Sequence, residues 1–456
     1  MTPDLPLRPQ SAADLRACFT RLRDAGTALA RLPLVDLLVR LEDLGQRWRP
    51  GAPAYEQATA LLGTVFGPRT VTASLEGLTL ALQRPVLFAE LGRELGRADL
   101  LDAWQPDEHG AGLVRGFPLG VVAQVLAGNV FLGGVIALAQ SLLTRNAVLL
   151  KLSSEDSGFT ELFTRTLMES DPDGPLSAAI AVCAWSSTQE ELNQVVREEA
   201  DAVVVWGGEA AIAAYPAVGC RGRVIHYGPR LGIGFLLEGC ELGPAVEALA
   251  WDVALWEQRA CSSPRLLFVE DAAGDGRRPA QAAAELSRAL TLVRERLPAR
   301  PLSLDDKAEV LAVRELAWWQ ERSRLFAAAA SMDHTVLLSA GPPAAVPLGY
   351  RTVTLVPFAG LAQLPELLRQ YQSGLQTAVL AAPAERWPAA AAALARAGLT
   401  QVAAAGSAAA RFLGLPHEGE FALRRLVRLV GIDLGAGPLT APGRAVMDAG
   451  PLLQQV

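Results

Sequence analysis

The feature that most constrains the fold is an alternation of apolar and amphipathic segments between residues 121 and 228. Each apolar run has the length of a buried strand, and most are followed by a stretch with helical spacing. Such alternation is typical of right-handed βαβ crossovers, and it predicts a parallel sheet with helices on both faces. The expected strands are VVAQVLA (121–127), AVLLKL (147–152), AAIAVCAW (178–185), AVVVW (202–206) and RVIHYG (223–228).

The regions on either side of this alternation have their own patterns. The first hundred residues place Leu15, Phe19, Leu22 and similar apolar positions at helical spacing, so we expect helices there. After about residue 236 a second α/β unit follows, with helices expected at 243–258, 279–298 and 303–322, and strands at 265–270, 334–339, 352–357, 377–382 and 401–405. We therefore expect three regions: 1–235 with the helices and a doubly wound sheet, 236–405 as a second α/β domain, and 406–456 as a C-terminal segment. That last segment should return to the first domain or contribute to an oligomer interface.

One segment also allows a different interpretation. From Gly116 to Thr144 the chain has no charged residue, which is long enough to span a bilayer. However, FPLG at 117–120, AGN at 127–129 and GG at 133–134 interrupt it. We therefore favour a buried strand, a tight turn and a helix, and expect no membrane span.

Composition argues against several classes of protein. The net charge is −7, whereas binding to nucleic acid needs a concentrated basic face. The five cysteines form no CxxC pair, and none of the four histidines is spaced with a cysteine like a metal ligand. We therefore expect free thiols and no metal site. No basic segment followed by an apolar core opens the chain, so we expect no secretion signal and a cytoplasmic location.

Cys261 is the first candidate for chemistry. It lies in WEQRACSSPRLLFVE (256–270), after a predicted helix and between small residues that leave room for a substrate carbonyl. Arg259 and Arg265 are near in sequence and would favour the thiolate, which is the nucleophilic form of cysteine. A lone cysteine is nevertheless often a buried structural residue, and Cys183, inside an apolar strand, is interpreted that way. From these residues alone both interpretations of Cys261 stay open.

Three upstream features lie at the ends of predicted strands, where ligands bind in doubly wound sheets. Asn129 follows the first strand and could donate to an oxyanion, although an Asn in such a turn, taken alone, more often supplies turn or capping geometry. Lys151 ends the next strand, where it could reach a ribose or phosphate or simply mark a solvated strand end. Gly207 and Gly208 open a helix after VVVW, which suits close backbone approach to a phosphate or ring, or an ordinary tight turn. No GxGxxG motif follows any of these strands.

Taken in order, these segments resemble the aldehyde dehydrogenase superfamily and, within it, the LuxC-type acyl-CoA reductase family. The resemblance covers roughly residues 115–435. It is carried by FPLGVVAQVLAGNVF (117–131), AVLLKLSSED (147–156), AVVVWGGEAAI (202–212), VIHYGPRLGIGF (224–235), EQRACSSPR (257–265), GLQTAVLAA (374–382) and PHEG (416–419). It implies an aldehyde-dehydrogenase-like α/β fold, with a nicotinamide-cofactor domain at 1–235 and a catalytic cysteine domain at 236–405.

The resemblance also implies roles for individual residues. Cys261 falls at the position of the nucleophile and Asn129 at that of the oxyanion-stabilising amide. Lys151 matches a lysine that contacts the adenosine ribose, and Ser153 and Ser154 take the place where an NAD-preferring member has a carboxylate. The remaining candidates for cofactor binding are Gly207, Gly208 and Tyr227. We expect NADPH as cofactor, with NADH as the alternative.

Two departures from the superfamily pattern are informative, and the first of them favours reduction over hydrolysis. The loop VIHYGPR (224–230) carries His226 or Tyr227 where hydrolytic members have a water-activating glutamate, and the segment VPLGYR (346–351) lacks the glutamate that holds the nicotinamide ribose. Without that base, a thioester is a better partner than water. We therefore expect an acyl-thioester reductase that converts an acyl-CoA to an aldehyde, with CoA as leaving group.

Two alternatives to this function stay open. One is NAD(P)-dependent aldehyde oxidation, and the other is a non-catalytic, acyl-carrying partner of an acyl synthetase. The expected partners are an acyl-CoA or another acyl thioester, an acyl-protein synthetase, and further copies of the chain in a homo-oligomer.

Overall fold

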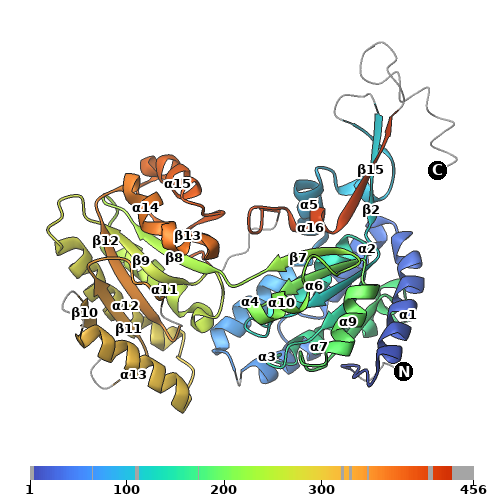
Figure 1. The fold of residues 1–456 in the computed structure, drawn as a ribbon, viewed down its shortest axis with the longest axis horizontal. Helices are drawn as coiled ribbons and strands as arrows, with labels where there is room; N and C mark the ends of the chain where they lie inside the picture. The colour runs from blue at the N-terminus through green and yellow to red at the C-terminus, as the bar shows by residue number, and fades with distance from the viewer. Residues whose placement is uncertain are drawn as a thin grey trace, which may run out of the picture.

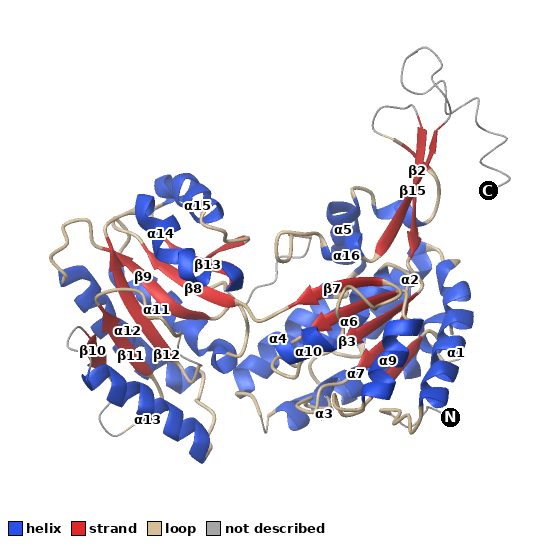
Figure 2. Cartoon of the chain, in the orientation of Figure 1, coloured by secondary structure: helices blue, strands red, loops and turns tan. Residues whose placement is uncertain are grey.

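The structure is a computed structural model that describes residues 5–63, 65–107, 112–172, 174–319, 323–327, 331–346, 349–408 and 414–433. Figures 1 and 2 show two lobes, each built on one sheet, and a small third sheet that projects from one of them. The predicted strand–helix alternation forms one lobe, and the region around Cys261 belongs to the other. This arrangement confirms the α/β fold class predicted from the sequence.

The first lobe contains a five-stranded, fully parallel sheet in the order β5-β4-β3-β6-β7. Its central strands are buried on both faces, which explains their unbroken apolar sequences. The strands are β3 (Val121–Val125), β4 (Ala147–Lys151), β5 (Ile180–Cys183), β6 (Ala202–Trp206) and β7 (Arg223–Tyr227). The helices between them are α6 (Leu132–Leu143), α7 (Phe159–Ser170), α8 (Pro175–Ala178), α9 (Glu190–Glu199) and α10 (Glu209–Ala214).

The N-terminal helices complete this lobe, as the apolar spacing predicts. α1 opens with a capping box, in which Ser11 accepts from the Asp14 backbone N–H and the Asp14 carboxylate accepts from that of Ser11. The fully buried Trp48 stacks on Phe163 of α7, with ring centroids 5.4 Å apart. The helices are α1 (Ala12–Ala30), α2 (Leu34–Gln46), α3 (Pro53–Leu62), α4 (Pro68–Ala81), α5 (Arg84–Leu95) and the 3₁₀ helix η1 (Ala98–Leu101).

The second lobe contains a seven-stranded sheet in the order β10-β11-β12-β9-β8-β13-β14, parallel except for the edge strand β10. Its strands are β8 (Leu231–Leu236), β9 (Pro264–Glu270), β10 (Ser323–Phe326), β11 (Thr335–Ser339), β12 (Thr352–Phe358), β13 (Leu375–Ala381) and β14 (Gln401–Ala404). Its helices are α11 (Leu242–Ala254), η2 (Leu255–Gln258), α12 (Arg277–Arg296), α13 (Leu304–Trp319), η3 (Leu361–Gln363), α14 (Leu364–Leu368), η4 (Arg369–Gly374), η5 (Ala384–Arg386) and α15 (Trp387–Arg396).

β8 pairs with β9 and β13, so the chain passes between the two sheets at residues 228–230. One detail of the second lobe differs from the sequence expectation. The helix expected at 243–258 ends at Ala254, and the next four residues form a strained turn. Nothing in the apolar spacing of that segment signals such a turn.

The third sheet joins distant parts of the chain. β2 (Gly112–Pro118) pairs antiparallel with β1 (Gln105–Pro106) and with β15 (Val427–Asp433). The short helix α16 (Ala422–Arg425) leads into β15, and Asn146 Nδ2 donates to the carbonyl oxygen of Leu426 at 2.9 Å. The described part of the C-terminal segment therefore packs against the first lobe, while residues 434–456 lie outside the described residues.

The uncharged run at 116–144 is distributed over the end of β2, β3, a turn and α6. Gly134 in α6 has the side chain of Thr160 against it, since a Cβ there would lie 2.3 Å from Thr160 Oγ1. Within the described part of the chain, no helix has the length and apolarity needed to cross a membrane.

Candidate active site

A cavity of about 680 Å³ lies between the lobes, and we call it the central cavity. From the first lobe it is lined by Asn129, Ser153, Gly207, Gly208 and Tyr227, all of which were candidates from the sequence. From the second lobe Cys261 lines it. The structure therefore brings six of the eight candidate residues together. Five of them lie at the carboxyl ends of the first-lobe strands, where ligands bind in such sheets, and Cys261 faces them from the loop before β9.

The backbone before Cys261 is strained. Trp256, Glu257 and Gln258 are consecutive residues in the left-handed region, with φ of 63°, 52° and 58°. Each such conformation costs on the order of 1–3 kcal/mol for a residue other than glycine, so surrounding contacts must hold it. Backbone strain of this kind clusters at functional sites.

Three anchors hold this turn. Gln258, almost fully buried, donates from Nε2 to the carbonyl oxygens of Pro264 and Thr352 and accepts from the Thr352 N–H, each at 3.0 Å. Glu257 forms an ion pair with the fully buried Arg351. Trp256 packs into the first lobe, with its ring centroid 5.1 Å from that of Phe131. The turn thus fixes the cysteine loop to both lobes.

Different groups around the Cys261 thiol act on its pKa in opposite directions. Cys261 is exposed at the cavity surface. Protein atoms nevertheless surround the sulfur, and this burial, followed by the negative charge of Glu418, raises the pKa of the thiol. Hydrogen bonds from its own backbone N–H, from the Gln376 side chain and from the Ser262 N–H lower that pKa in part. The same N–H groups are available to an oxyanion that forms at this sulfur.

Glu418→Gln is therefore expected to make the thiol ionise at lower pH. The substitution removes a negative charge that raises the thiol pKa and leaves the positive charge of Arg230 uncompensated, and both changes favour the thiolate. The measurement is the rate of alkylation of Cys261 by iodoacetamide against pH. Glu155→Gln, which removes another carboxylate lining the cavity, is the control and should leave the midpoint in place. An unchanged or higher midpoint for Glu418→Gln would contradict this account of the thiol.

Asn129 links the first lobe to the cysteine loop. It follows β3, and its Nδ2 donates to the carbonyl oxygen of Arg259 at 2.8 Å, two residues before Cys261. A side-chain amide carries two N–H donors, so one remains for a ligand. This position suits the oxyanion-stabilising role that the sequence suggests, and it also ties the two lobes together.

On the first-lobe side, the cavity is formed by the turns that follow β3, β4, β6 and β7. Trp206 and Tyr227, at the ends of β6 and β7, stack with ring centroids 4.1 Å apart beside the Gly207–Gly208 turn. Gly128 lies in the turn after β3, and Glu155 lies in the turn after β4. A Cβ at Gly128 would lie 2.6–2.8 Å from atoms of Glu155, so only glycine fits where these two turns meet. Open backbone turns beside aromatic faces fit a nucleotide with a flat ring.

Two candidates lie elsewhere. Lys151 does not line the cavity; it is buried, its Nζ lies 5.2 Å from the centroid of the Trp185 ring, and burial lowers its pKa. Ser154 is exposed and also does not line the cavity. His226 interacts through Nε2 with the Tyr215 carbonyl oxygen at 2.8 Å, which agrees with a structural role for that histidine.

The sequence interpretation missed three residues near the thiol. Glu418, Arg230 and Gln376 all act on Cys261 electrostatically or by hydrogen bonding. Each lies in a segment that carries the family resemblance, namely PHEG, VIHYGPRLGIGF and GLQTAVLAA. No local pattern shows that these segments meet, because VIHYGPRLGIGF lies more than a hundred residues before the other two, and those two are separated by α15 and β14.

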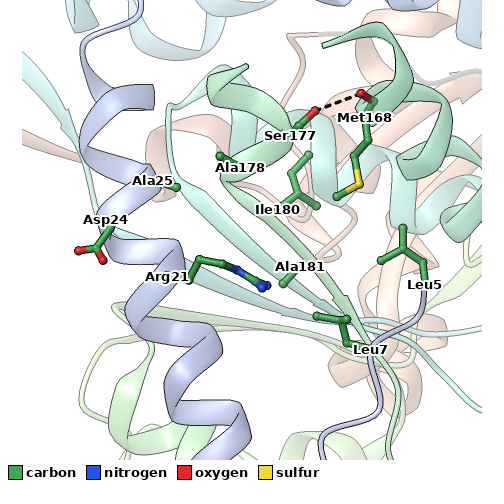
Figure 3. A pocket seen from close by; sticks show the side chains of 10 residues that line it. All are labelled: Leu5, Leu7, Arg21, Asp24, Ala25, Met168, Ser177, Ala178, Ile180 and Ala181. Atoms are coloured by element: carbon green, nitrogen blue, oxygen red, sulfur yellow. Dashed lines mark hydrogen bonds between the residues drawn. The ribbon is translucent and has the colours of Figure 1, made fainter. Parts of the chain in front are cut away.

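A second cavity, of about 410 Å³, lies between α1 and β5. Figure 3 shows apolar side chains around it, including Leu5, Met168 and Ile180, with Arg21 at one side. None of the candidate residues lines it. Among the described residues, no group of three or more His, Cys, Asp or Glu side chains could hold a metal ion.

Comparison with known proteins identifies the family. Residues 29–429 match the family model described as acyl-CoA reductase (LuxC). The chain belongs to this family. The match confirms the resemblance that the ordered motifs indicate.

The curated relatives of this LuxC-family protein include long-chain acyl-protein thioester reductases. The long-chain acyl-protein thioester reductase of Vibrio harveyi is 29% identical over 272 residues, covering 58% of this chain and 55% of that protein. The corresponding protein of Aliivibrio fischeri is 27% identical over 236 residues, covering 50% of this chain and 48% of that protein. The chain thus spans about half the length of the curated relatives it matches.

Solved structures give the fold. A NAD-dependent benzaldehyde dehydrogenase from Corynebacterium glutamicum matches with a TM-score of 0.69 at 14% identity, covering 93% of this chain and 91% of that one. A glyceraldehyde-3-phosphate dehydrogenase from Methanocaldococcus jannaschii matches with a TM-score of 0.67 at 12% identity, covering 93% and 95%. At such identities the likeness shows the aldehyde-dehydrogenase-like fold and nothing further.

Proposed function

We propose that this protein is an acyl-thioester reductase that forms an aldehyde through an acyl group bound to Cys261. The observation that carries the proposal is a single cavity with three components. They are a cysteine that follows a strained turn anchored to both lobes, an amide from the opposite lobe, and open turns suited to a nucleotide. Membership of the acyl-CoA reductase family supports the same chemistry.

The first step follows from the residues around the thiol. The Cys261 thiolate attacks the carbonyl carbon of the thioester, and the developing oxyanion takes hydrogen bonds from Asn129 and the backbone N–H of Cys261. Collapse of this intermediate expels the donor thiol and leaves an acyl group on the sulfur. After reduction, the same groups stabilise the oxyanion whose collapse releases the aldehyde and restores the thiolate.

The cavity fits a nicotinamide cofactor on its first-lobe side, where the turn at Gly207–Gly208 adjoins the Trp206 and Tyr227 rings. NADPH, when bound there, supplies the hydride. Ser153 lines the cavity where a carboxylate would repel a ribose 2′-phosphate, and this favours NADPH. Glu155 lines it as well and favours NADH, so both cofactors belong in the test. The M. jannaschii structure, which shares the fold, is a complex with NADP.

For the acyl donor we propose only its chemical class, a thioester. The family description gives an acyl-CoA, whereas the names of the curated relatives give a long-chain acyl-protein thioester. Both are thioesters, and the mechanism at Cys261 is the same for each. A homo-oligomer, an acyl-protein synthetase as partner, and the domain boundaries at 235 and 405 stay predictions.

The test is cofactor oxidation across a series of acyl-CoA chain lengths and an acyl-protein thioester, with NADPH and NADH compared. We expect equimolar aldehyde and oxidised cofactor, with NADPH preferred. Oxidation of added aldehyde by NADP⁺ to free acid, without reduction of any thioester, would favour the aldehyde dehydrogenase alternative instead.

A further inference from the structure

Two charged side chains from distant segments, Arg230 and Glu418, pair in the cavity that holds the reactive sulfur. Arg230 lies just before β8, and Glu418 lies in the loop that precedes α16. Arg230 Nη2 donates to Glu418 Oε2 at 2.5 Å, while its Nη1 donates to the carbonyl oxygen of Ser373 at 3.0 Å. Both side chains line the central cavity together with Cys261.

Glu418 has an unfavourable backbone conformation and a largely buried carboxylate. Its φ is 53°, a region that glycine adopts freely and that residues with a side chain usually avoid. Its side chain is only 9% exposed, so the carboxylate is largely desolvated and depends on Arg230 as its ionic partner. A loop needed only for connection would be served better by glycine. The carboxylate therefore calls for an explanation in the chemistry of the cavity.

Glu418 and Arg230 both lie within electrostatic range of the sulfur. The charge of Glu418 raises the pKa of the Cys261 thiol, and the charge of a Cys261 thiolate contributes to raising the pKa of Arg230. A carboxylate in the same cavity as an acyl-cysteine can accept a proton from water, and general-base catalysis of this kind is effective in enzymes. The hydrogen bond from Arg230 Nη2 occupies one lone pair of Oε2, and the positive charge of the guanidinium opposes transfer of a proton to this carboxylate.

We propose that Glu418 is a water-activating carboxylate held out of action by Arg230, and that this ion pair decides whether the acyl group on Cys261 is reduced or hydrolysed. The inference rests on the proposed function, because it needs an acyl group on Cys261. The protein would therefore carry a latent thioesterase activity. Arg230 acts as a positioning residue, since it works through Glu418.

The latent reaction balances without any further reagent. Glu418 takes a proton from water while the oxygen attacks the acyl carbon and a tetrahedral intermediate forms on Cys261. Collapse of the intermediate breaks the carbon–sulfur bond and releases the carboxylic acid. The thiolate then receives the proton held by Glu418, so that the sum is acyl-cysteine plus water giving acid plus thiol.

The experiment acylates the full-length protein with octanoyl-CoA in the absence of any nicotinamide cofactor. Intact-protein mass spectrometry follows the decay of the acyl-enzyme, and the released octanoic acid is quantified. Arg230→Met is compared with the wild type, with Glu418→Gln and with the double variant. Arg230→Lys keeps the positive charge beside Glu418, and Arg300→Met removes another arginine that lines the cavity. Thermal melting of each variant checks that it is folded.

Arg230→Met is expected to hydrolyse its acyl-enzyme about 100-fold faster than the wild type, at the lower end of general-base effects. The decay should be slower in D₂O, because a proton moves in the slow step. The double variant, Arg230→Lys and Arg300→Met should all decay close to the wild-type rate. If instead the cavity were merely opened to water, the double variant would decay as fast as Arg230→Met, and that result would overturn the inference.

The inference and the proposed function fail in distinguishable ways. An acyl-enzyme that forms on Cys261 but decays equally slowly in all the variants overturns the inference and leaves the proposed function standing. A protein that never acquires an acyl group on Cys261 overturns the proposed function, and the inference with it. Should Arg230→Met not fold, Arg230→Gln keeps a polar side chain without the charge and makes the same prediction.

Discussion

Replacing Cys261 with alanine should lower aldehyde formation from acyl thioesters by roughly 10⁴-fold or more, as the loss of a catalytic nucleophile does in enzymes. The reason is chemical: no other described cysteine lines the central cavity, so no other thiol there can take over. The assay is aldehyde production from acyl-CoA and NADPH under single-turnover conditions. The fold should persist, because Cys261 belongs to none of the hydrophobic core clusters that the described residues form.

Cys240→Ala is a matched control for this substitution. Cys240 is partly exposed and lies in the second lobe, but its thiol donates to the Leu237 carbonyl oxygen outside the cavity. It should retain activity within about twofold, since surface substitutions of this kind change stability little. Substantial aldehyde formation by Cys261→Ala would mean that the thioester is reduced directly, without transfer to the protein.

Replacing Arg351 with methionine is expected to have the second largest effect. Arg351 is 1% exposed, pairs with Glu257 and donates from Nη2 to the Leu297 carbonyl oxygen at 2.8 Å. Removal of one partner from a buried pair leaves the other charge uncompensated and costs about 3–5 kcal/mol. Because Glu257 belongs to the strained turn before Cys261, both stability and catalysis should fall.

Urea unfolding and single-turnover kinetics measure these two effects separately. The double variant Arg351→Met/Glu257→Gln should recover part of the lost stability, because it buries no unpaired charge. It should recover less of the activity, since the anchor of the turn is still missing. Arg369→Met serves as the control, because Arg369 and its partner Glu366 are both largely exposed and such pairs contribute little. A wild-type urea midpoint and rate for Arg351→Met would show that the ion pair does not hold the turn.

The parts of the fold that follow from local pattern were predictable. The strands of the first lobe are short, apolar and regularly spaced, and their positions in the sequence locate β3, β4, β5, β6 and β7 to within a few residues. β8 and the third sheet were not predicted. LGIGFL in β8 carries two glycines, and β2 and β15 pair across 300 residues of chain, so no local signal marks them.

In the candidate site, too, some residues could be predicted from local pattern and others could not. Cys261, Asn129 and the Gly207–Gly208 turn could be found because each stands at a recognisable strand or helix end. Glu418 could not, since its significance depends on a contact with Arg230, 188 residues away in sequence. The loop 224–230 has no carboxylate, but Glu418 from another segment lines the same cavity and its charge acts on the thiol. Sequence reasoning about a missing base is therefore incomplete until the fold is known.

The most direct test of the central claim is to observe the acyl group on Cys261 and its fate. The protein is incubated with an acyl-CoA alone, digested, and examined by mass spectrometry for an acyl-modified peptide that contains Cys261; NADPH is then added to a matched sample. The account predicts stoichiometric acylation at Cys261, followed by loss of the modification and release of one equivalent of aldehyde. An unmodified Cys261 during turnover, or an acyl-cysteine that NADPH does not discharge as aldehyde, would contradict it.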